Sequence, residues 1–354
     1  MTIALRQRPL ARVVAGIVRA NDGLLFDIGD MSTMFQDAAG TIPVTAVEQP
    51  VGKILDKSGN GYHATQSITA SRPTLSARKN ILLATETLAT QSVTTLAATY
   101  TLSFTGAGSV ALSGAATGTL TGNGTDRVSL TFTPTAGTLT LTVSGSVTKA
   151  QIELGAVAGP YQRVNTATDY DTDERYFKKY LRFDGIDDYL VLPYMGLYAA
   201  GSASVVMGID DRTQTGNSRA FSESSSTTSS QYSIRNLTNG GFDSYIVDDT
   251  GALFVDTLNT KGTESKNYII SVVDTGTNIT RYRNSTSENA QSYSRAGKTL
   301  TANKTTIGAL DTRGTMTAYT AMNLYGLIIT KSALTDSQRV ACERFEARKS
   351  GVLM

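Results

Sequence analysis

The sequence contains no tryptophan, one cysteine and one histidine among its 354 residues. With Cys342 as the only thiol, a disulfide within a single chain is excluded. A zinc site of histidine and cysteine ligands cannot be assembled from one chain that offers only Cys342 and His63. A nucleophile activated by a histidine base would have to use His63. Carboxylates, tyrosines and arginines are therefore the main candidate functional side chains.

The chain also has little charge and no long apolar run. Charged residues make up 18% of the sequence and the net charge is +2, which is too weak to predict binding to nucleic acid or to an anionic membrane. No stretch approaches the ~20 apolar residues that a membrane-spanning helix needs. The N-terminus has arginines but no continuous apolar segment, so we expect no signal peptide. We predict neither a nucleic-acid partner nor membrane insertion.

The residues that are abundant favour β-structure. Glycine occurs 32 times, and threonine, serine and asparagine dominate the polar remainder. This mixture is typical of many short strands joined by turns. A chain of this length suggests about two domains, each large enough to bury its own core.

The clearest strand pattern lies within residues 77–165. Between Val128 and Val143, apolar residues alternate with serine and threonine on both sides of a Pro/Gly turn. A period of two predicts strands that bury one face, and the turn between them predicts a β-hairpin. We expect the opposite, threonine-coated face of the hairpin to lie in water.

Residues 181–330 contain short apolar runs separated by glycine, asparagine and aspartate. Their spacing of ~10–15 residues is typical of an antiparallel sandwich. Residues 335–349 are the one segment whose pattern predicts a good helix, capped by Thr335 or Asp336 and ended by Gly351.

The side of this helix that is buried also follows from the pattern. We expect Val340, Ala341, Phe345 and the stem of Arg344 to lie together on that side. Cys342 is expected to be a small buried apolar residue.

Residues 1–22 have four arginines and no acidic residue before Asp22. Pro9 limits any helix at the start. Because an arm this long cannot bury itself, we interpret the segment as a basic arm that covers a neighbouring subunit or anchors the chain in a larger assembly. The alternative is a terminal extension that pairs locally as a strand.

Two motifs carry a family resemblance. Asp56 to Ala64 reads DKSGNGYHA, and Phe183 to Asp188 reads FDGIDD. Both resemble consecutive segments of the laminin-G-like, concanavalin A-type jelly rolls of bacteriophage tail and virion proteins. In that family the second motif closely follows the first, whereas here about a hundred residues separate them. The resemblance implies one jelly roll formed by residues 23–76 and 166–354, interrupted by an insert at 77–165.

The insert has a resemblance of its own. Gln151 to Gly155 and Pro160 to Arg163 are similar to the ending of carbohydrate-binding-module-like jelly rolls in phage fibres. Together the two resemblances imply a mainly β fold: an antiparallel laminin-G-like jelly-roll sandwich with a second, inserted β-sandwich and one C-terminal helix.

What the resemblance implies for function is a virion structural protein of a tail fibre, baseplate or capsid-attached spike, made in the host cytoplasm and released by lysis. Its lectin-like modules would attach to host surface glycans, and its other partners would be virion proteins and copies of itself, a trimer being usual for phage fibres. Two alternatives stay open: an architectural decoration protein that binds only virion proteins, and a polysaccharide depolymerase, which needs a carboxylate pair in a groove. We expect no enzyme.

Sugar binding usually combines exposed aromatic rings with polar groups that hold hydroxyls. Because tryptophan is absent, tyrosines must serve. The predicted glycan-binding residues are Tyr194, Tyr198, Tyr232, Arg235, Asn236 and Tyr245.

The second motif also offers hard oxygen ligands. Some laminin-G-like domains bind calcium, so the resemblance implies Asp187 and Asp188 as Ca²⁺ ligands. The alternative is a turn in which the aspartates accept hydrogen bonds from nearby backbone N–H groups. For His63 we expect a structural role.

Overall fold

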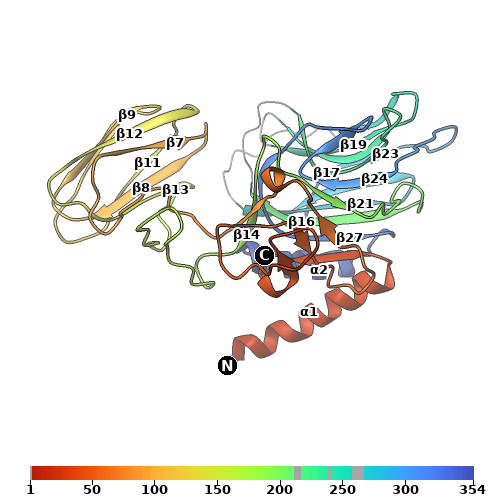
Figure 1. Ribbon diagram of the computed structural model, residues 1–354, viewed down its shortest axis with the longest axis horizontal. Helices are drawn as coiled ribbons and strands as arrows, with labels where there is room; N and C mark the ends of the chain where they lie inside the picture. The colour runs from red at the N-terminus through yellow and green to blue at the C-terminus, as the bar shows by residue number, and fades with distance from the viewer. Residues whose placement is uncertain (1, 211–216, 238–240, 257–266) are drawn as a thin grey trace. The chain divides into compact units, whose positions relative to one another are not determined.

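The computed structural model describes residues 2–210, 217–237, 241–256 and 267–354, with side chains from Leu10 onwards. The chain forms two compact units (Figure 1). The first consists of the described parts of Met1–Ser76, Lys179–Gly262 and Asn267–Met354, and the second of Ala77–Lys178. The connector after residue 165 thus groups with the second unit up to Lys178.

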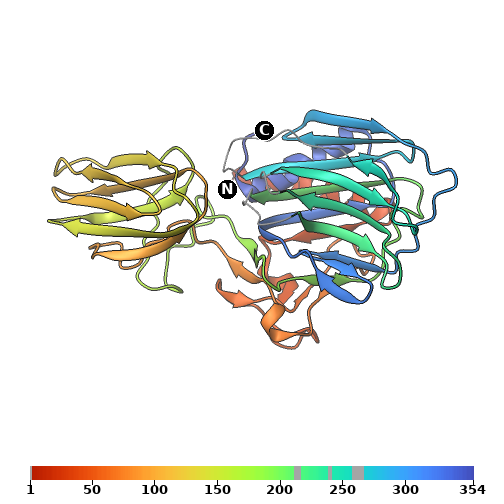
Figure 2. The same cartoon turned by 90° about the horizontal axis from the view of Figure 1, so that it is seen from above.

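The first unit contains two large antiparallel sheets (Figure 2). The described strands of one sheet follow the order β23-β22-β21-β16-β27-β14-β6-β3, with β1 also paired to β27. Their bounds are β1 (Leu24–Asp27), β3 (Gln49–Pro50), β6 (Thr74–Ser76), β14 (Tyr180–Asp184), β16 (Ala203–Asp210), β21 (Asn267–Asp274), β22 (Asn278–Arg283), β23 (Thr286–Ser292) and β27 (Ala321–Thr330).

The second sheet follows the order β2-β4-β5-β15-β24-β17-β18-β19-β20. Its strands are β2 (Met34–Phe35), β4 (Lys53–Ile54), β5 (Ala64–Thr65), β15 (Leu190–Leu192), β17 (Ser218–Ser224), β18 (Gln231–Asn236), β19 (Phe242–Val247), β20 (Leu253–Asp256) and β24 (Lys304–Ile307). A separate hairpin pairs β25 (Leu310–Thr312) with β26 (Thr315–Thr317), and short 3₁₀ turns span Met31–Thr33 and Thr69–Ser71.

Segments from both sides of the insert pair within these sheets. Leu24 of β1 lies opposite Ile329 of β27, Ser76 of β6 opposite Tyr180 of β14, and β5 pairs with β15. A single apolar core lies between the two sheets, and it draws residues from before and after the insert. Successive side chains of a strand point to opposite faces of the sheet, so alternate residues enter this core. Val205 and Met207 of β16 belong to the core, while Val206 between them faces the opposite way.

The predicted C-terminal helix is α2 (Asp336–Ser350). Thr335 and Gln338 form a capping box at its start, and Gly351 ends it in the left-handed conformation at φ 77°. The expectation for its buried side was wrong. Arg344 is exposed and Val340 and Ala341 are half-buried, whereas the side facing the sheet buries Phe345 together with polar residues. The buried residues of α2 are Arg339, Cys342, Glu343, Phe345, Glu346, Ala347 and Ser350.

The polar residues on this side explain why hydrophobic patterning misplaced it. Glu343 accepts hydrogen bonds from Arg339 and from Ser271 of the sheet, both at 2.6 Å. Glu346 lies over Gly208 and Gly326, which are cross-strand partners on β16 and β27. The missing side chains of this glycine pair leave room for the Glu346 carboxyl, which is fully buried with no hydrogen-bond partner among the described residues. Burial, reinforced by the charge of Asp27, raises the pKa of Glu346 well above its usual value.

The segment interpreted as a basic arm forms a second helix, α1 (Thr2–Ala20), so the prediction that Pro9 limits any helix at the start was wrong. Val14 and Val18, four residues apart, are fully buried and belong to one apolar cluster with Cys342 and Phe345 of α2. Figure 1 shows both helices along the same side of the sheet, where α2 contacts β16, β21 and β27 and α1 contacts α2, β1 and β27. Packing of an apolar stripe contributes more to helix stability in proteins than local propensity does. Neither described helix is long and apolar enough to cross a membrane.

The second unit is itself a sandwich. One sheet has the order β10-β9-β12-β7 and the other β11-β8-β13, around a core that is continuous between them. The strands are β7 (Gln91–Thr95), β8 (Tyr100–Thr105), β9 (Ser109–Gly114), β10 (Gly118–Thr121), β11 (Val128–Phe132), β12 (Gly137–Ser144) and β13 (Thr148–Leu154). The structure thus confirms the predicted fold class of antiparallel sandwiches with a C-terminal helix.

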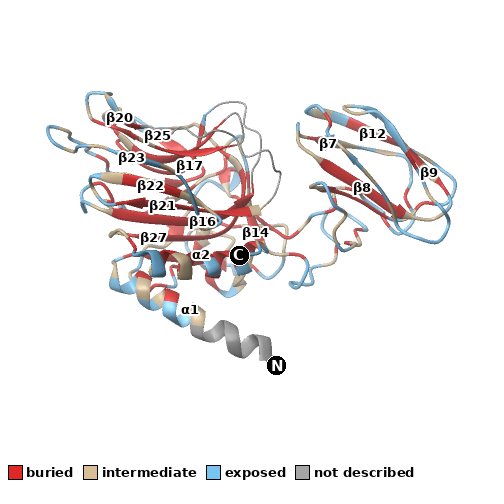
Figure 3. Ribbon diagram, turned by 180° about the vertical axis from the view of Figure 1, so that it is seen from behind, coloured by how far each residue is buried: buried red, intermediate tan, exposed pale blue. Residues whose placement is uncertain are grey.

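The predicted hairpin between Val128 and Val143 was wrong in its pairing. Both strands exist, but β11 pairs with β8 while β12 pairs with β9 and β7, so the Pro/Gly segment crosses from one sheet to the other. Leu139 and Leu141 of β12 are fully buried in the shared core, and Leu130 of β11 packs against it. Figure 3 shows buried stretches along β8 and β12, one from each sheet. Alternation determines which side of a strand is buried, but it does not select the partner.

The motif at the end of the second unit, Gln151 to Gly155 with Pro160 to Arg163, has a structural role. Gln151 accepts a hydrogen bond from the Gln162 backbone at 2.7 Å, and Glu153 accepts one from the Gly159 backbone at 2.7 Å. Arg127 binds Ser103 at 2.7 Å and the Gly159 carbonyl at 2.5 Å. These contacts fold the segment after β13 back over the outer face of its own sheet.

The glycine pair generates a stability prediction. In Gly326→Ala the new methyl group would overlap the Glu346 carboxyl, so we expect a loss of about 2 kcal/mol in the free energy of unfolding, the usual cost of overpacking. Chemical denaturation monitored by circular dichroism measures it. Gly16→Ala in α1 is the matched control, because nothing lies within 4 Å of the added carbon. A Gly326→Ala variant as stable as the wild type would contradict this packing.

Candidate functional site

The first sequence motif builds a structural loop. The Asp56 carboxylate accepts hydrogen bonds from the backbones of Leu25, Ser58, Gly61 and Tyr62 at 2.8–3.2 Å. His63 accepts one from the Asp56 backbone at 3.0 Å through Nδ1. The structural role expected for His63 is confirmed, and the loop is tied to the start of β1.

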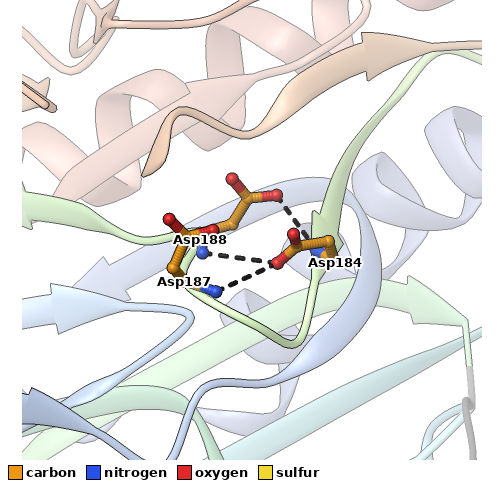
Figure 4. A group of neighbouring side chains, drawn as sticks. All are labelled: Asp184, Asp187 and Asp188. Atoms are coloured by element: carbon orange, nitrogen blue, oxygen red, sulfur yellow. Dashed lines mark hydrogen bonds between the residues drawn. The ribbon is translucent and has the colours of Figure 1, made fainter. Parts of the chain in front are cut away.

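The second motif forms an acidic turn (Figure 4). Asp184 Oδ1 accepts from the backbones of Ile186 and Asp187 at 2.8 and 3.2 Å, and Asp188 Oδ2 accepts from the Asp184 backbone at 3.0 Å. One oxygen from each of Asp184, Asp187 and Asp188 lies within 4.8 Å of the others, a spacing that could hold a metal ion. Burial, then the charges of Asp184 and Asp187, raise the pKa of Asp188 to about 6. The turn interpretation is thus realised, and the calcium interpretation stays a prediction.

The outer face of β17–β19 gathers arginine and tyrosine side chains. Tyr232 and Ile234 of β18 belong to the core, so Arg235 points to the opposite face. There it lies directly opposite Arg219 of β17 and Asp243 of β19. Arg235 holds Asp243 through two contacts, Nε to Oδ1 at 2.8 Å and Nη2 to Oδ2.

Tyr245 is the aromatic centre of this face. The Arg235 and Arg219 guanidinium carbons lie 3.8 and 5.4 Å from its ring centroid, within the range of cation–π attraction. Arg219 also donates from Nε to the Gln231 side chain at 2.9 Å. Tyr245 and Gln231 are half-buried, while each arginine is 7% exposed. We call Arg219, Gln231, Arg235, Asp243 and Tyr245 the arginine–tyrosine face.

Two guanidinium groups, those of Arg219 and Arg235, thus lie side by side on this face, with the Asp243 carboxylate held by Arg235. Burial, followed by repulsion from Arg235, lowers the pKa of Arg219 to about 10. An anion near Arg219 would therefore be attracted to it. Chemically, the arrangement can hold a negative group beside an aromatic ring.

Of the six predicted glycan-binding residues, Arg235 and Tyr245 meet on this face. Tyr232 and Asn236 point into the sandwich, are 2% and 0% exposed, and offer no surface to a sugar. Tyr198 is 9% exposed and packs against Phe254, with the Arg295 guanidinium 4.4 Å from its ring centroid. Tyr194 is 39% exposed in the segment after β15.

Arg219 was missed by sequence reasoning. It stands in the run of strand residues before the serine-rich segment, where nothing in its neighbours marks it. Pairing of β17 with β18 places it opposite Arg235. Only knowledge of that register could have found it.

No protein-family model matches the sequence, and no curated protein matches it. Among solved structures, the chain is similar to the carbohydrate-binding module CBM40 of the Ruminococcus gnavus IT-sialidase bound to α2,3-sialyllactose, with a TM-score of 0.36, 11% identity, and coverage of 46% of this chain and 91% of that one. It is also similar to the K499G mutant of the NanB sialidase of Streptococcus pneumoniae (TM-score 0.37, 15% identity, 46% of this chain) and to the Trypanosoma rangeli sialidase in complex with the inhibitor DANA (0.36, 12%, 46%).

The match spans only 27% of either sialidase chain. Likenesses this distant assign neither a family nor a ligand to this chain. The resemblance to phage virion proteins stays a prediction.

The acidic turn gives a pH-dependent prediction. The pKa of Asp188 is raised from 3.8 to about 6 in the fold, so its stabilising neutral form is fully present below about pH 4 and is lost as the pH rises through 6. Asp188→Asn keeps an oxygen for the Asp184 N–H and cannot ionise. A two-unit shift corresponds to ~2.7 kcal/mol at most, and solvent screening reduces this to about 1 kcal/mol. We expect the variant to be more stable than wild type by that amount at pH 7.5 and equal to it at pH 4, as measured by urea denaturation.

Calcium addition separates the two interpretations of the turn. If the three carboxylates ligate Ca²⁺, the wild-type unfolding midpoint at pH 7.5 rises with calcium concentration, and Asp188→Asn removes the rise. A wild-type midpoint independent of calcium would contradict the calcium prediction.

Proposed function

We propose that this protein binds acidic glycans through the arginine–tyrosine face and does not hydrolyse them. The observation that carries the proposal is the placement of two guanidinium groups, Arg219 and Arg235, side by side next to the Tyr245 ring. A sugar carboxylate would bring a negative charge to the two guanidinium groups. Charge-assisted hydrogen bonds from arginine to a carboxylate are among the stronger polar contacts.

Rigidity of the face supports a binding role. Arg235 is fixed by Asp243 and by stacking on Tyr245, and Arg219 is fixed by Gln231 and by the Asn217 carbonyl at 3.2 Å. Side chains already held in place lose little entropy when a ligand binds. The half-buried Tyr245 ring would supply the aromatic contact for a pyranose beside the guanidinium groups.

The same contacts argue against hydrolysis at this face. Asp243 is fully buried and engaged with Arg235, so it is not free to act as an acid or a nucleophile. Glycoside hydrolysis needs two available carboxyl groups across the scissile bond. A depolymerase acting elsewhere on the chain is the less favoured alternative.

For the biological setting we keep the proposal drawn from the two sequence motifs, a virion structural protein that attaches to host surface glycans. Self-association and contact with other virion proteins belong to this proposal. The architectural alternative, a decoration protein without glycan affinity, differs from it in one measurable property, the binding of sugar.

The test compares 3′-sialyllactose with lactose, which differ by the acidic sugar. We expect isothermal titration calorimetry to show binding of sialyllactose and at least tenfold weaker binding of lactose. Arg219→Gln and Tyr245→Ala should each weaken sialyllactose binding at least tenfold, equivalent to ~1.4 kcal/mol. The affinity should fall with added salt.

Arg175→Gln is the matched control, because Arg175 stacks on Tyr176 in a solvent-exposed pair on the second unit. It should leave binding unchanged. Equal affinity for lactose and sialyllactose, or sialyllactose binding that survives Arg219→Gln, would contradict the proposal. Absence of any binding would favour the architectural alternative, and shortened polysaccharide would favour the depolymerase.

A further inference from the structure

We propose a second sugar-binding site, for an uncharged sugar, formed by Asp22, Tyr62, Tyr194 and Lys331 of the first unit. The four residues come from the turn after α1, the loop that Asp56 organises, the segment after β15 and the residue after β27. The proposal does not rest on the arginine–tyrosine face. It assigns a ligand-binding role to the first sequence motif, whose only histidine is structural.

Three of the four side chains form one hydrogen-bonded network. Lys331 Nζ donates to Asp22 Oδ2 at 2.7 Å and also binds the Tyr62 hydroxyl. The Tyr62 hydroxyl lies 3.1 and 3.2 Å from the two Asp22 oxygens. The Asp22 side chain is 59% exposed and that of Lys331 22%. The network thus presents a carboxylate, an ammonium and a phenol at hydrogen-bond spacing, and solvent reaches it.

The backbone fixes the position of the carboxylate. Asp22 has a φ of 45°, in the left-handed region that non-glycine residues adopt at a cost. The Lys331 N–H donates to the Asn21 carbonyl at 3.0 Å, and Ser332 binds the Asn21 side chain. The turn after α1 is therefore fastened to the end of β27, which lies more than 300 residues away along the chain.

The Asp56 loop fixes Tyr62 in turn. Gly59 and Gly61 have φ values of 89° and 86°, which only glycine adopts readily, and they turn the chain around the Asp56 carboxylate. That carboxylate accepts the Tyr62 N–H at 3.2 Å. The Tyr62 ring packs partly against the core, so its polar end is directed to the network.

Tyr194 supplies an aromatic surface next to this network. Thr65 of β5 lies opposite Val191 of β15 in an antiparallel pair, and Tyr62 and Tyr194 are each three residues from that pair, so both chain segments leave the sheet at the same end. The charge of Lys331 acts on the Tyr194 phenol and partly offsets the effect of burial, which raises the pKa of Tyr194.

The buried Glu223 carboxyl fixes the segment that follows Tyr194. It accepts hydrogen bonds from the backbone N–H groups of Gly196 and Leu197 at 2.7 Å each. A carbon added at Gly196 would lie 3.5 Å from the Tyr194 ring, so the ring rests on this turn.

The charge of the site selects the ligand class. The hydrogen bond from Lys331 lowers the pKa of Asp22, so both groups are charged at neutral pH and cancel each other. Glu223, behind Tyr194, adds no positive charge. A carboxylated sugar gains nothing here, whereas sugar hydroxyls can donate to Asp22, accept from Lys331 and stack against Tyr194.

The test is calorimetric titration of the full chain with maltotetraose, cellotetraose and mannotetraose, and with 3′-sialyllactose alongside. We expect at least one neutral tetrasaccharide to bind, and Tyr194→Ala and Asp22→Asn each to weaken it at least tenfold. Asparagine tolerates the left-handed backbone at position 22 and removes only the charge. Tyr176→Ala, at another exposed tyrosine, is the control and should change nothing.

The two binding proposals can be refuted independently of each other. Arg219→Gln should leave neutral-sugar binding unchanged, and Tyr194→Ala should leave sialyllactose binding unchanged. Binding of none of the three tetrasaccharides, or neutral-sugar binding that survives Tyr194→Ala, would overturn the second site. Loss of neutral-sugar binding in Arg219→Gln would mean that one site serves both ligands, and it would also overturn the inference.

Discussion

The structure of the first unit depends on strand pairing across the insert. β1 and β6 come before residue 77, and their partners β27 and β14 come after residue 178. Neither half of the sandwich could satisfy its backbone hydrogen bonds or bury its apolar residues alone. Because Ser76 and Tyr180 are opposite each other, the insert leaves and re-enters the unit at one place in the sheet. The segments that carry Tyr62 and Tyr194 both belong to this sandwich.

Buried carboxyl groups then organise what the sheets leave irregular. Asp56 gathers a loop around itself, Glu223 holds the turn after Tyr194, and Glu346 occupies the gap over a glycine pair. Burial raises the pKa of Glu223 to about 7, although the N–H and hydroxyl groups that donate hydrogen bonds to it act in the opposite direction. Each of these acids has a low intrinsic preference for burial, and each is retained where backbone N–H groups or a missing side chain make room for it.

Sequence reasoning recovered the features that local chemistry determines. The acidic turn and the cap and end of α2 follow from residue types at fixed spacing, and the structure has both. It could not recover features that depend on distant partners. The crossing between β11 and β12, the packing of α1 beside α2 and the register that sets Arg219 opposite Arg235 are all determined by tertiary contacts. The prediction that Tyr232 binds a glycan at the surface failed for the same reason. Alternation does not tell which face of a strand meets the second sheet, and Tyr232 lies on the buried face.

The central claim is that the first unit is one sandwich whose closure does not need the insert. Replacement of residues 77–179 by the two-residue turn Asn-Gly would join Ser76 to Tyr180 as a β-hairpin in the existing register. Thermal unfolding of this shortened chain, followed by circular dichroism, tests the claim most directly. We predict a β-rich spectrum with one cooperative transition. A shortened chain that is unfolded or melts without cooperativity would show that the two segments do not form a sandwich on their own.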